Sequence, residues 1–165
     1  MGKLGWLAVC LSCALGATGC SSSDADEDGE GDSPSVSIDE LSIEPTTVAD
    51  GDTFVVTWRV SHTTSVGFFT QIGLYLGGES GLETASARDS RSLFSAAATA
   101  GAPTDPSNSS MSCTRTGDNL RCDTTGGNTR SVPAGEAQVT FRACNSYVLD
   151  TEEVCRMRSM VMTFP

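Results

Sequence analysis

Cysteine spacing in the C-terminal third of the chain places the strongest constraint on its fold, because it predicts a specific hairpin register. Residues 112–123 read SCTRTGDNLRCD, in which Gly-Asp at 117–118 forms a two-residue loop. Glycine at the first loop position suits a type II′ turn. Counting outward from this loop places Cys113 opposite Cys122 in a non-hydrogen-bonded pair. In such pairs the Cα atoms lie about 4.5 Å apart, which is within disulfide range, so we predict a Cys113–Cys122 bridge.

A second hairpin is predicted around the segment NSYVLDTEEV, which Cys144 and Cys155 flank. On both sides of this segment the sequence alternates between apolar and polar residues. A register that pairs the two cysteines places Val139 opposite Met160, so one face of the hairpin stays apolar. We therefore predict a Cys144–Cys155 bridge at the mouth of this hairpin.

Alternation of apolar and polar side chains dominates the chain from residue 35 onward, and it is typical of half-buried β-strands. The segments with such alternation are residues 36–43, 53–61, 68–76, 137–144 and 156–164. In the first of them the phase shifts after Ile38, which indicates a bulge or a strand that switches sheets. Short strands separated by turns predict an all-β antiparallel β-sandwich of about seven strands.

Residues 83–110 have the least decided pattern. Leu93 and Phe94 fit the core of a strand, whereas the alanine-rich stretch 95–102 fits a helical turn equally well. Two prolines after it indicate an irregular loop. Strand and helix both stay open for this segment.

The N-terminal segment, MGKLGWLAVCLSCALGATGC, has the three-part build of a secretory signal peptide. One charge at Lys3 precedes an apolar run to about Ala17, which is too short to span a bilayer as a helix. The Thr-Gly pair before Cys20 resembles the lipobox of bacterial lipoproteins, with Ala17 where leucine or valine is usual. The resemblance implies that residues 1–19 are removed and that acyl chains on Cys20 attach to a lipid bilayer. Ordinary signal-peptidase cleavage near Ala17 is the alternative.

Lipidation implies a place in the cell envelope. Serines follow Cys20 where an aspartate retains many such lipoproteins at the inner membrane, so we expect the outer membrane. Export also favours the oxidation of thiols. Because no Cys-x-x-Cys motif occurs after Cys20, we interpret the four later cysteines as structural bridges rather than as metal or redox sites.

Residues 20–34 form an acidic segment between Cys20 and the patterned region. It carries six carboxylates and no apolar side chain larger than alanine, apart from the cysteine and a proline, so we predict a flexible tether. Its D-x-D-x-D-G start at Asp24 fits a calcium loop, but Gly31 and Ser35 break that pattern. The net charge of −11 argues against nucleic acid as a partner.

The last two predicted strands resemble the F–G hairpin of bacterial immunoglobulin-like and fibronectin type III-like domains. The resemblance rests on VTFRACNS followed by a second cysteine at the start of the final strand, and on Trp58 in FVVTWRV. It covers residues 35–165 and implies an immunoglobulin-like β-sandwich for them. Ala137 stands near the place where the fibronectin group has a tyrosine.

Few residues offer catalysis or metal binding. His62, the one histidine, follows a predicted strand and is interpreted as a solvated strand-end residue. Asp50 and Asp52 could ligate calcium at one end of a sandwich, although Asp-Gly-Asp also fits an ordinary turn. GGESGL at 77–82 lacks the spacing of a nucleophile elbow and fits a glycine-rich turn. We therefore expect neither enzymatic activity nor a cofactor.

Tyr147, Val148 and Leu149 are the candidate binding residues, because an apolar triplet on a disulfide-closed loop offers contact area at low ordering cost. The alternative is that they fold back onto the core. We expect a non-catalytic envelope lipoprotein that acts in binding, adhesion or as an accessory subunit, with an envelope protein or glycan as partner. The alternative functions are a hydrolase with an unrecognised site and a carbohydrate-binding module. Such a module would use exposed aromatic side chains, for which Tyr75 and Tyr147 are available, and Trp58 only if it lies outside the core; the alternation of its strand places Trp58 on the inward face, which weakens this alternative.

Overall fold

The computed structural model describes residues 33–99, 107–123, 128–148 and 153–165. The predicted signal peptide, Cys20 and most of the predicted tether lie outside these residues, so those predictions stay predictions. Within the described ranges, no helix is long and apolar enough to cross a membrane.

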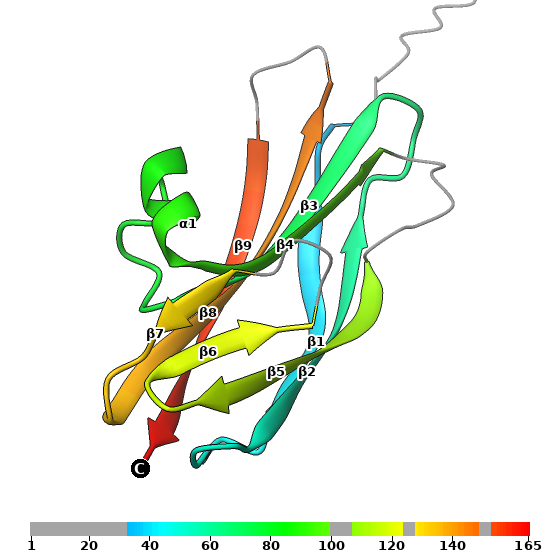
Figure 1. Ribbon diagram of the computed structural model, residues 1–165. Coiled ribbons are helices and arrows are strands. Elements are labelled where there is room, and N and C mark those ends of the chain that lie inside the picture. The colour runs from blue at the N-terminus through cyan, green and yellow to red at the C-terminus, as the bar shows by residue number, and fades with distance from the viewer. Residues whose placement is uncertain (1–32, 100–106, 124–127, 149–152) are drawn as a thin grey trace, which may run out of the picture. The chain divides into compact units, whose positions relative to one another are not determined.

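Two antiparallel sheets pack face to face as a β-sandwich, which confirms the predicted fold class (Figure 1). The first sheet has the strand order β1-β2-β5-β6-β7 and the second the order β4-β3-β8-β9. The strands are β1 (Val36–Glu44), β2 (Thr53–His62), β3 (Phe68–Leu76), β4 (Ser92–Thr99), β5 (Asn108–Thr116), β6 (Asn119–Cys122), β7 (Thr129–Ser131), β8 (Gly135–Tyr147) and β9 (Glu153–Phe164).

The described residues form nine strands, which corrects the expectation of about seven. The additional strands are those with the weakest alternation. β7 has only 3 residues, and three of the eight residues of β4 are alanines. A strand that is this short, or that has such small side chains, shows no apolar face in its sequence. Pairing with the neighbouring strand, rather than its own alternation, determines that it forms.

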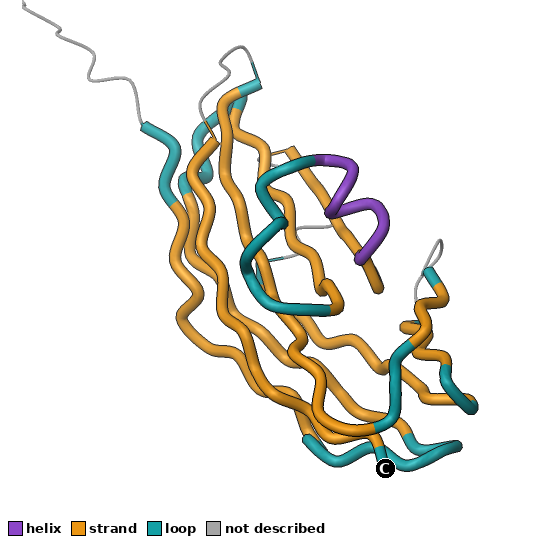
Figure 2. The backbone as a smooth tube through the Cα atoms, turned by 90° about the vertical axis from the view of Figure 1, so that its left-hand side faces the viewer, coloured by secondary structure: helices purple, strands orange, loops and turns teal. Residues whose placement is uncertain are grey.

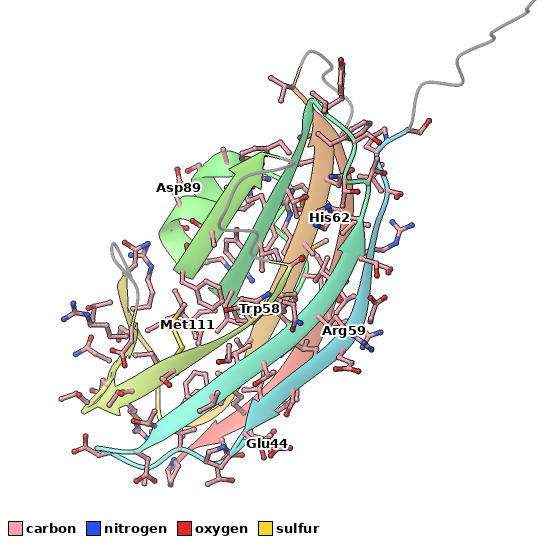
Figure 3. All side chains as sticks on the ribbon, turned by 90° about the vertical axis from the view of Figure 1, so that its right-hand side faces the viewer. Glu44, Trp58, Arg59, His62, Asp89 and Met111 are labelled. Carbon is pink, nitrogen blue, oxygen red and sulfur yellow. A yellow bond between two sulfur atoms is a disulfide. The ribbon has the colours of Figure 1, made fainter. Side chains whose placement is uncertain are left out.

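The core lies between the two sheets and follows the alternating pattern. On β2 the apolar inward-facing side chains are buried, while the residues between them are exposed. Trp58 lies between the layers (Figure 3), and its ring centroid is 5.5 Å from that of Phe94 and 5.5 Å from that of Phe141. Because Phe94 and Phe141 belong to the second sheet, this aromatic cluster joins the two layers.

The N-terminal part of the domain pairs with both sheets, through β1 with the first and through residues 46–48 with the second. Its register against β2 shifts within β1, which confirms the predicted bulge. After Pro45, which has a cis peptide bond, the chain pairs in parallel with β9. The Thr163 N–H donates to the Thr46 carbonyl at 2.8 Å, and the Val48 N–H donates to the Thr163 carbonyl at 2.9 Å. A bulge and a change of sheet therefore both occur.

Both predicted disulfides are present in the predicted registers. Cys113 faces Cys122 and is bridged to it between β5 and β6. Cys144 faces Cys155 and is bridged to it between β8 and β9. Gly117 in the two-residue loop has a φ of +58°, as a primed turn requires. The cysteine spacing thus predicted the pairing of both hairpins correctly.

The undecided segment contains the helix α1 (Ala85–Arg91) followed by β4. α1 begins after Thr84, whose hydroxyl accepts a hydrogen bond from the Ala87 N–H at 3.2 Å. Figure 2 shows α1 on the outer side of the strands and not between the two sheets. Residues 95–99, the described part of the alanine-rich stretch, pair with β3 instead of forming a helical turn, because buried Leu93 and Phe94 anchor β4 against the core.

Arginine side chains fasten the loops at the strand ends. Arg115 is almost fully buried and donates to three backbone oxygens at 2.7 to 2.9 Å, those of Val48, Gly117 and Pro165. Arg91 holds the glycine-rich turn at 77–82 in a similar way, because its guanidinium donates to the carbonyls of Leu76, Gly78 and Ser80. A guanidinium can hold several carbonyls at once because its N–H groups fan out in one fixed plane.

Candidate binding site

The predicted binding residues lie at one end of the sandwich, where β8 ends beside the turn that leads into β3. The Val148 N–H donates to the Gly67 carbonyl at 2.8 Å, so this backbone position is held by the neighbouring turn. We call Val66, Gly67, Phe68, Tyr147 and Val148 the end-loop surface. Leu149, the third predicted residue, lies outside the described residues.

Tyr147 folds back onto the domain. Its ring centroid lies 5.2 Å from that of Phe68, which is itself buried. The ring also lies against Gly67, where a Cβ atom would come within 2.5 Å of the Tyr147 Cε2 atom. Gly67 therefore provides the space for the tyrosine as well as the positive φ of +91° that the turn needs.

Val148 and Val66 point outward instead. The exposed fraction is 58 % for Val148 and 94 % for Val66. Of the two alternatives for the predicted loop, folding back thus applies to Tyr147 and exposure to Val148. Val66 is not among the predicted binding residues, although its position between Ser65 and Gly67 in a turn is a signal for exposure.

Asn145 lies fully buried beneath the end-loop surface and holds several elements together. Its Oδ1 accepts a hydrogen bond from the Ser35 N–H at 3.1 Å. Its Nδ2 donates to the Thr70 hydroxyl at 3.2 Å and to the Thr63 carbonyl at 3.3 Å. The first residues of the domain, the connection after β2, β3 and β8 all meet at this one amide, which sequence reasoning did not identify.

His62 belongs to the same polar cluster. Its Nδ1 lies 3.0 Å from the Thr70 hydroxyl and 3.1 Å from the Thr63 carbonyl. The interpretation as a solvated strand-end histidine is therefore wrong in part: His62 ends β2 as expected, but its ring is half-buried and hydrogen-bonded. Figure 3 shows His62 at the end of the domain opposite Glu44.

The Cys144–Cys155 bridge stiffens the strands that carry this end. Next to it, the buried Arg142 guanidinium donates to the Glu153 carboxylate at 2.8 Å and contacts the Cys155 sulfur at 2.9 Å. Burial raises the pKa of the nearby Tyr75, and the positive charge of Arg142 opposes that rise. Among the described residues, Cys144, Glu153 and Cys155 are the one cluster with metal-ligand spacing, but both sulfurs are bonded to each other.

Asp50 and Asp52 lie near the opposite end, in the turn before β2. The Asp50 Oδ1 accepts a hydrogen bond from the Gly117 N–H at 2.6 Å, and the Asp52 Oδ2 accepts one from the Ala49 N–H at 3.1 Å. The Asp52 N–H in turn donates to the Ala49 carbonyl. The Asp52 carboxylate thus bonds within its own turn, and the Asp50 carboxylate joins this turn to the β5–β6 loop.

The aromatic side chains do not form the row that a carbohydrate platform needs. Trp58 and Tyr75 are both buried, with exposed fractions of 2 % and 3 %. Of the three aromatics that the alternative function relied on, Tyr147 alone reaches the surface. The expectation that Tyr75 could contribute to such a platform is therefore wrong.

Comparison with known proteins finds no matching family model and no matching curated protein for this chain.

Proposed function

We propose that this chain is a non-catalytic, lipid-anchored binding module of the bacterial cell envelope, with Cys20 as the lipidated residue and the outer membrane as its location. Exposure of Val66 and Val148 on a backbone that is already ordered carries the binding part of the proposal. A rigid apolar tip loses little conformational entropy when a partner covers it, so most of the free energy gained by burying it contributes to the affinity. The partner is an envelope protein, and a glycan is the alternative partner.

The strand order supports an immunoglobulin-like assignment for the domain. β4-β3-β8-β9 has the order of the sheet that carries the C, F and G strands in that fold, and β1-β2-β5 has the order of the A, B and E strands. Trp58 lies buried between the two sheets on β2, which takes the B position in this order. The β6–β7 extension is an addition of this chain to the usual pattern.

A Cys20→Ala variant tests the lipid anchor. When expressed in a bacterium with the lipoprotein pathway, the wild-type chain should incorporate an alkyne-labelled fatty acid and partition into the detergent phase of Triton X-114. The variant should do neither. Cys13→Ala, which changes a cysteine of the predicted leader, is the matched control and should behave as wild type. Equal fatty-acid labelling of wild type and Cys20→Ala would rule out the anchor.

Photo-crosslinking in intact cells tests the binding surface. A photoreactive amino acid at position 148 or 66 should capture a defined envelope protein. The same amino acid at Val55, which is exposed on the first sheet, is the matched control and should not. Equal capture from all three positions would refute a role for the end-loop surface, and recovery of glycan alone would refute the accessory-subunit proposal.

A further inference from the structure

β9 is an edge strand that already accepts one short strand on its outer side. At Thr163 the backbone N–H and carbonyl point away from β8 and bond to residues 46 and 48. Backbone groups alternate sides along a strand, so those of Val161, Ser159 and Met157 point the same way. Among the described residues, β8 and residue 47 supply the pairing of β9. On the N-terminal side of Thr163, the edge of β9 therefore offers Met157, Ser159 and Val161 for further strand pairing.

The open edge of β9 borders a groove between β9 and β1. Its larger hollow, of about 750 Å³, is lined by Met160 and residues 41–46, among them the half-buried Leu41 and the exposed Glu44. A smaller hollow of about 220 Å³ lies farther along the same two strands and is lined by Ser37, Ile38, Arg156, Met157 and Arg158. We call these two hollows the β1–β9 groove.

The two hollows of the β1–β9 groove differ in charge: the smaller one is basic, and the larger one has a mixed lining of apolar and polar residues that includes Glu44. Arg156, Arg158 and Met160 share one side of β9 because they alternate along it, and their partners on β8 face the core. Arg156 and Arg158 are exposed, and the Arg156 guanidinium donates to the carbonyl of Cys155 at the edge, at 2.9 Å. A strand added at this edge would meet a methionine and then two guanidinium groups.

We propose that the edge of β9 accepts an extended segment of an acidic partner protein as an additional antiparallel strand. The segment carries an apolar residue opposite Met160 and carboxylates opposite Arg158 and Arg156, which gives the order apolar-x-acidic-x-acidic along the partner. Main-chain hydrogen bonds at residues 157, 159 and 161 provide affinity, and the alternate side chains provide specificity.

A second copy of this chain does not fit the same edge. An antiparallel pair of β9 strands centred on Ser159 puts Arg158 against the Met160 of the other copy, and a parallel pair puts arginine against arginine. Neither arrangement brings a carboxylate of the other β9 strand to Arg158, and the net charge of −11 adds repulsion between two copies. Arg156 and Arg158 thus exclude self-pairing while favouring an acidic strand. This proposal does not depend on the lipid anchor.

Fluorescence anisotropy with the purified full chain tests the proposal. The probe is a fluorescein-labelled peptide of sequence Thr-Val-Thr-Asp-Thr-Asp-Thr, and the control peptide has lysine in place of aspartate. We expect saturable binding of the acidic peptide, at least about tenfold weaker binding of the lysine peptide, and loss of affinity with salt because the contact is partly exposed. Equal binding of both peptides would overturn the proposal.

Variants separate charge from strand pairing. Arg156→Gln with Arg158→Gln should weaken binding at least about tenfold, whereas Arg121→Gln, an exposed arginine on β6, should not. Met157→Pro removes an outward N–H while both arginines remain, and it should also weaken binding. In the unchanged chain, the amides of Met157, Ser159 and Val161 should exchange more slowly with peptide bound. If the exchange rates of these amides do not change with peptide bound, strand addition by a partner is contradicted. It is also contradicted if the chain forms a dimer without peptide and the arginine variants abolish that dimer.

Discussion

Asn145 and Ser35 are joined by a hydrogen bond across 110 positions of the sequence, with the Ser35 N–H donating to the Asn145 Oδ1 at 3.1 Å. This bond fastens the point where the chain enters the domain to the strand that ends in Tyr147 and Val148. The Ser35 hydroxyl also lies 2.8 Å from the Thr63 hydroxyl, which donates to the Ser33 carbonyl. The end-loop surface therefore rests on a polar cluster that includes the start of the domain.

Asn145→Ala should destabilise the domain by about 2–4 kcal/mol, because it removes a fully buried amide together with its hydrogen bonds to Ser35, Thr63 and Thr70. Urea unfolding followed by tryptophan fluorescence measures the change. Asn108→Ala, at an exposed asparagine that begins β5, is the matched control and should change stability by less than about 0.5 kcal/mol. Similar losses in both variants would contradict the proposed role of the amide.

Gly67→Ala should destabilise the domain more than Gly51→Ala. Both glycines have a positive φ, of +91° and +85°, so both substitutions strain the backbone by about 1–2 kcal/mol. Only at Gly67 does the new methyl group meet the Tyr147 ring, which must move. The difference in unfolding free energy between the two variants should shrink when Tyr147→Ala is added. If it does not, the packing of Tyr147 on Gly67 is not what the glycine provides.

Removing either disulfide by a double cysteine-to-alanine change should cost about 2–3 kcal/mol, since each bridge closes a short loop in the unfolded chain. Intact mass after alkylation under denaturing, non-reducing conditions should show no modified cysteine among Cys113, Cys122, Cys144 and Cys155. One alkylated cysteine in this set would show that the framework is incomplete. The two double variants control for each other, because each leaves the other hairpin closed.

Cysteine spacing and alternation predicted the parts of the fold that depend on local pairing. The registers of both C-terminal hairpins follow from counting outward from a turn, and each is confirmed residue by residue. α1 escaped prediction because its seven residues bury no side chain and so leave no apolar stripe in the sequence. The sequence pattern of β4 did not distinguish strand from helix, and its pairing with β3 decides the outcome.

The candidate site was predictable only at its exposed tip. Tyr147 and Val148 stand out in the sequence because they are apolar residues inside a polar loop. Asn145 does not stand out, because its partners lie 75 to 110 positions away and only the fold brings them together. The open edge of β9 is likewise a property of the sheet order, which a single strand's sequence does not contain.

The pKa of Asp39 should lie below its ordinary value of 3.8, because the Ser61 and Ser37 hydroxyls donate to its carboxylate and Arg59 and Arg158 lie nearby. A lowered folded-state pKa means that the ionised carboxylate stabilises the folded chain above pH 3.8, and that this contribution is lost as the pH falls through the folded-state value. An NMR titration of the Asp39 side chain measures the shift. Ser61→Ala should move this pKa upward, and an unchanged value would show that the hydroxyl is not its main cause.

Arg115→Lys should destabilise the domain although it keeps the charge. The guanidinium of Arg115 donates to backbone oxygens from the turn before β2, the β5–β6 loop and Pro165, and it lies 5.7 Å from the centre of the Phe164 ring. A lysine ammonium in the same buried place is a point charge that cannot span these three acceptors, so we expect a loss of about 2–4 kcal/mol. Urea unfolding at neutral pH measures it, with Arg121→Lys on β6 as the exposed control that should be nearly neutral. If Arg115→Lys leaves the free energy of unfolding unchanged, then charge alone, and not the geometry of the guanidinium, holds these loops together.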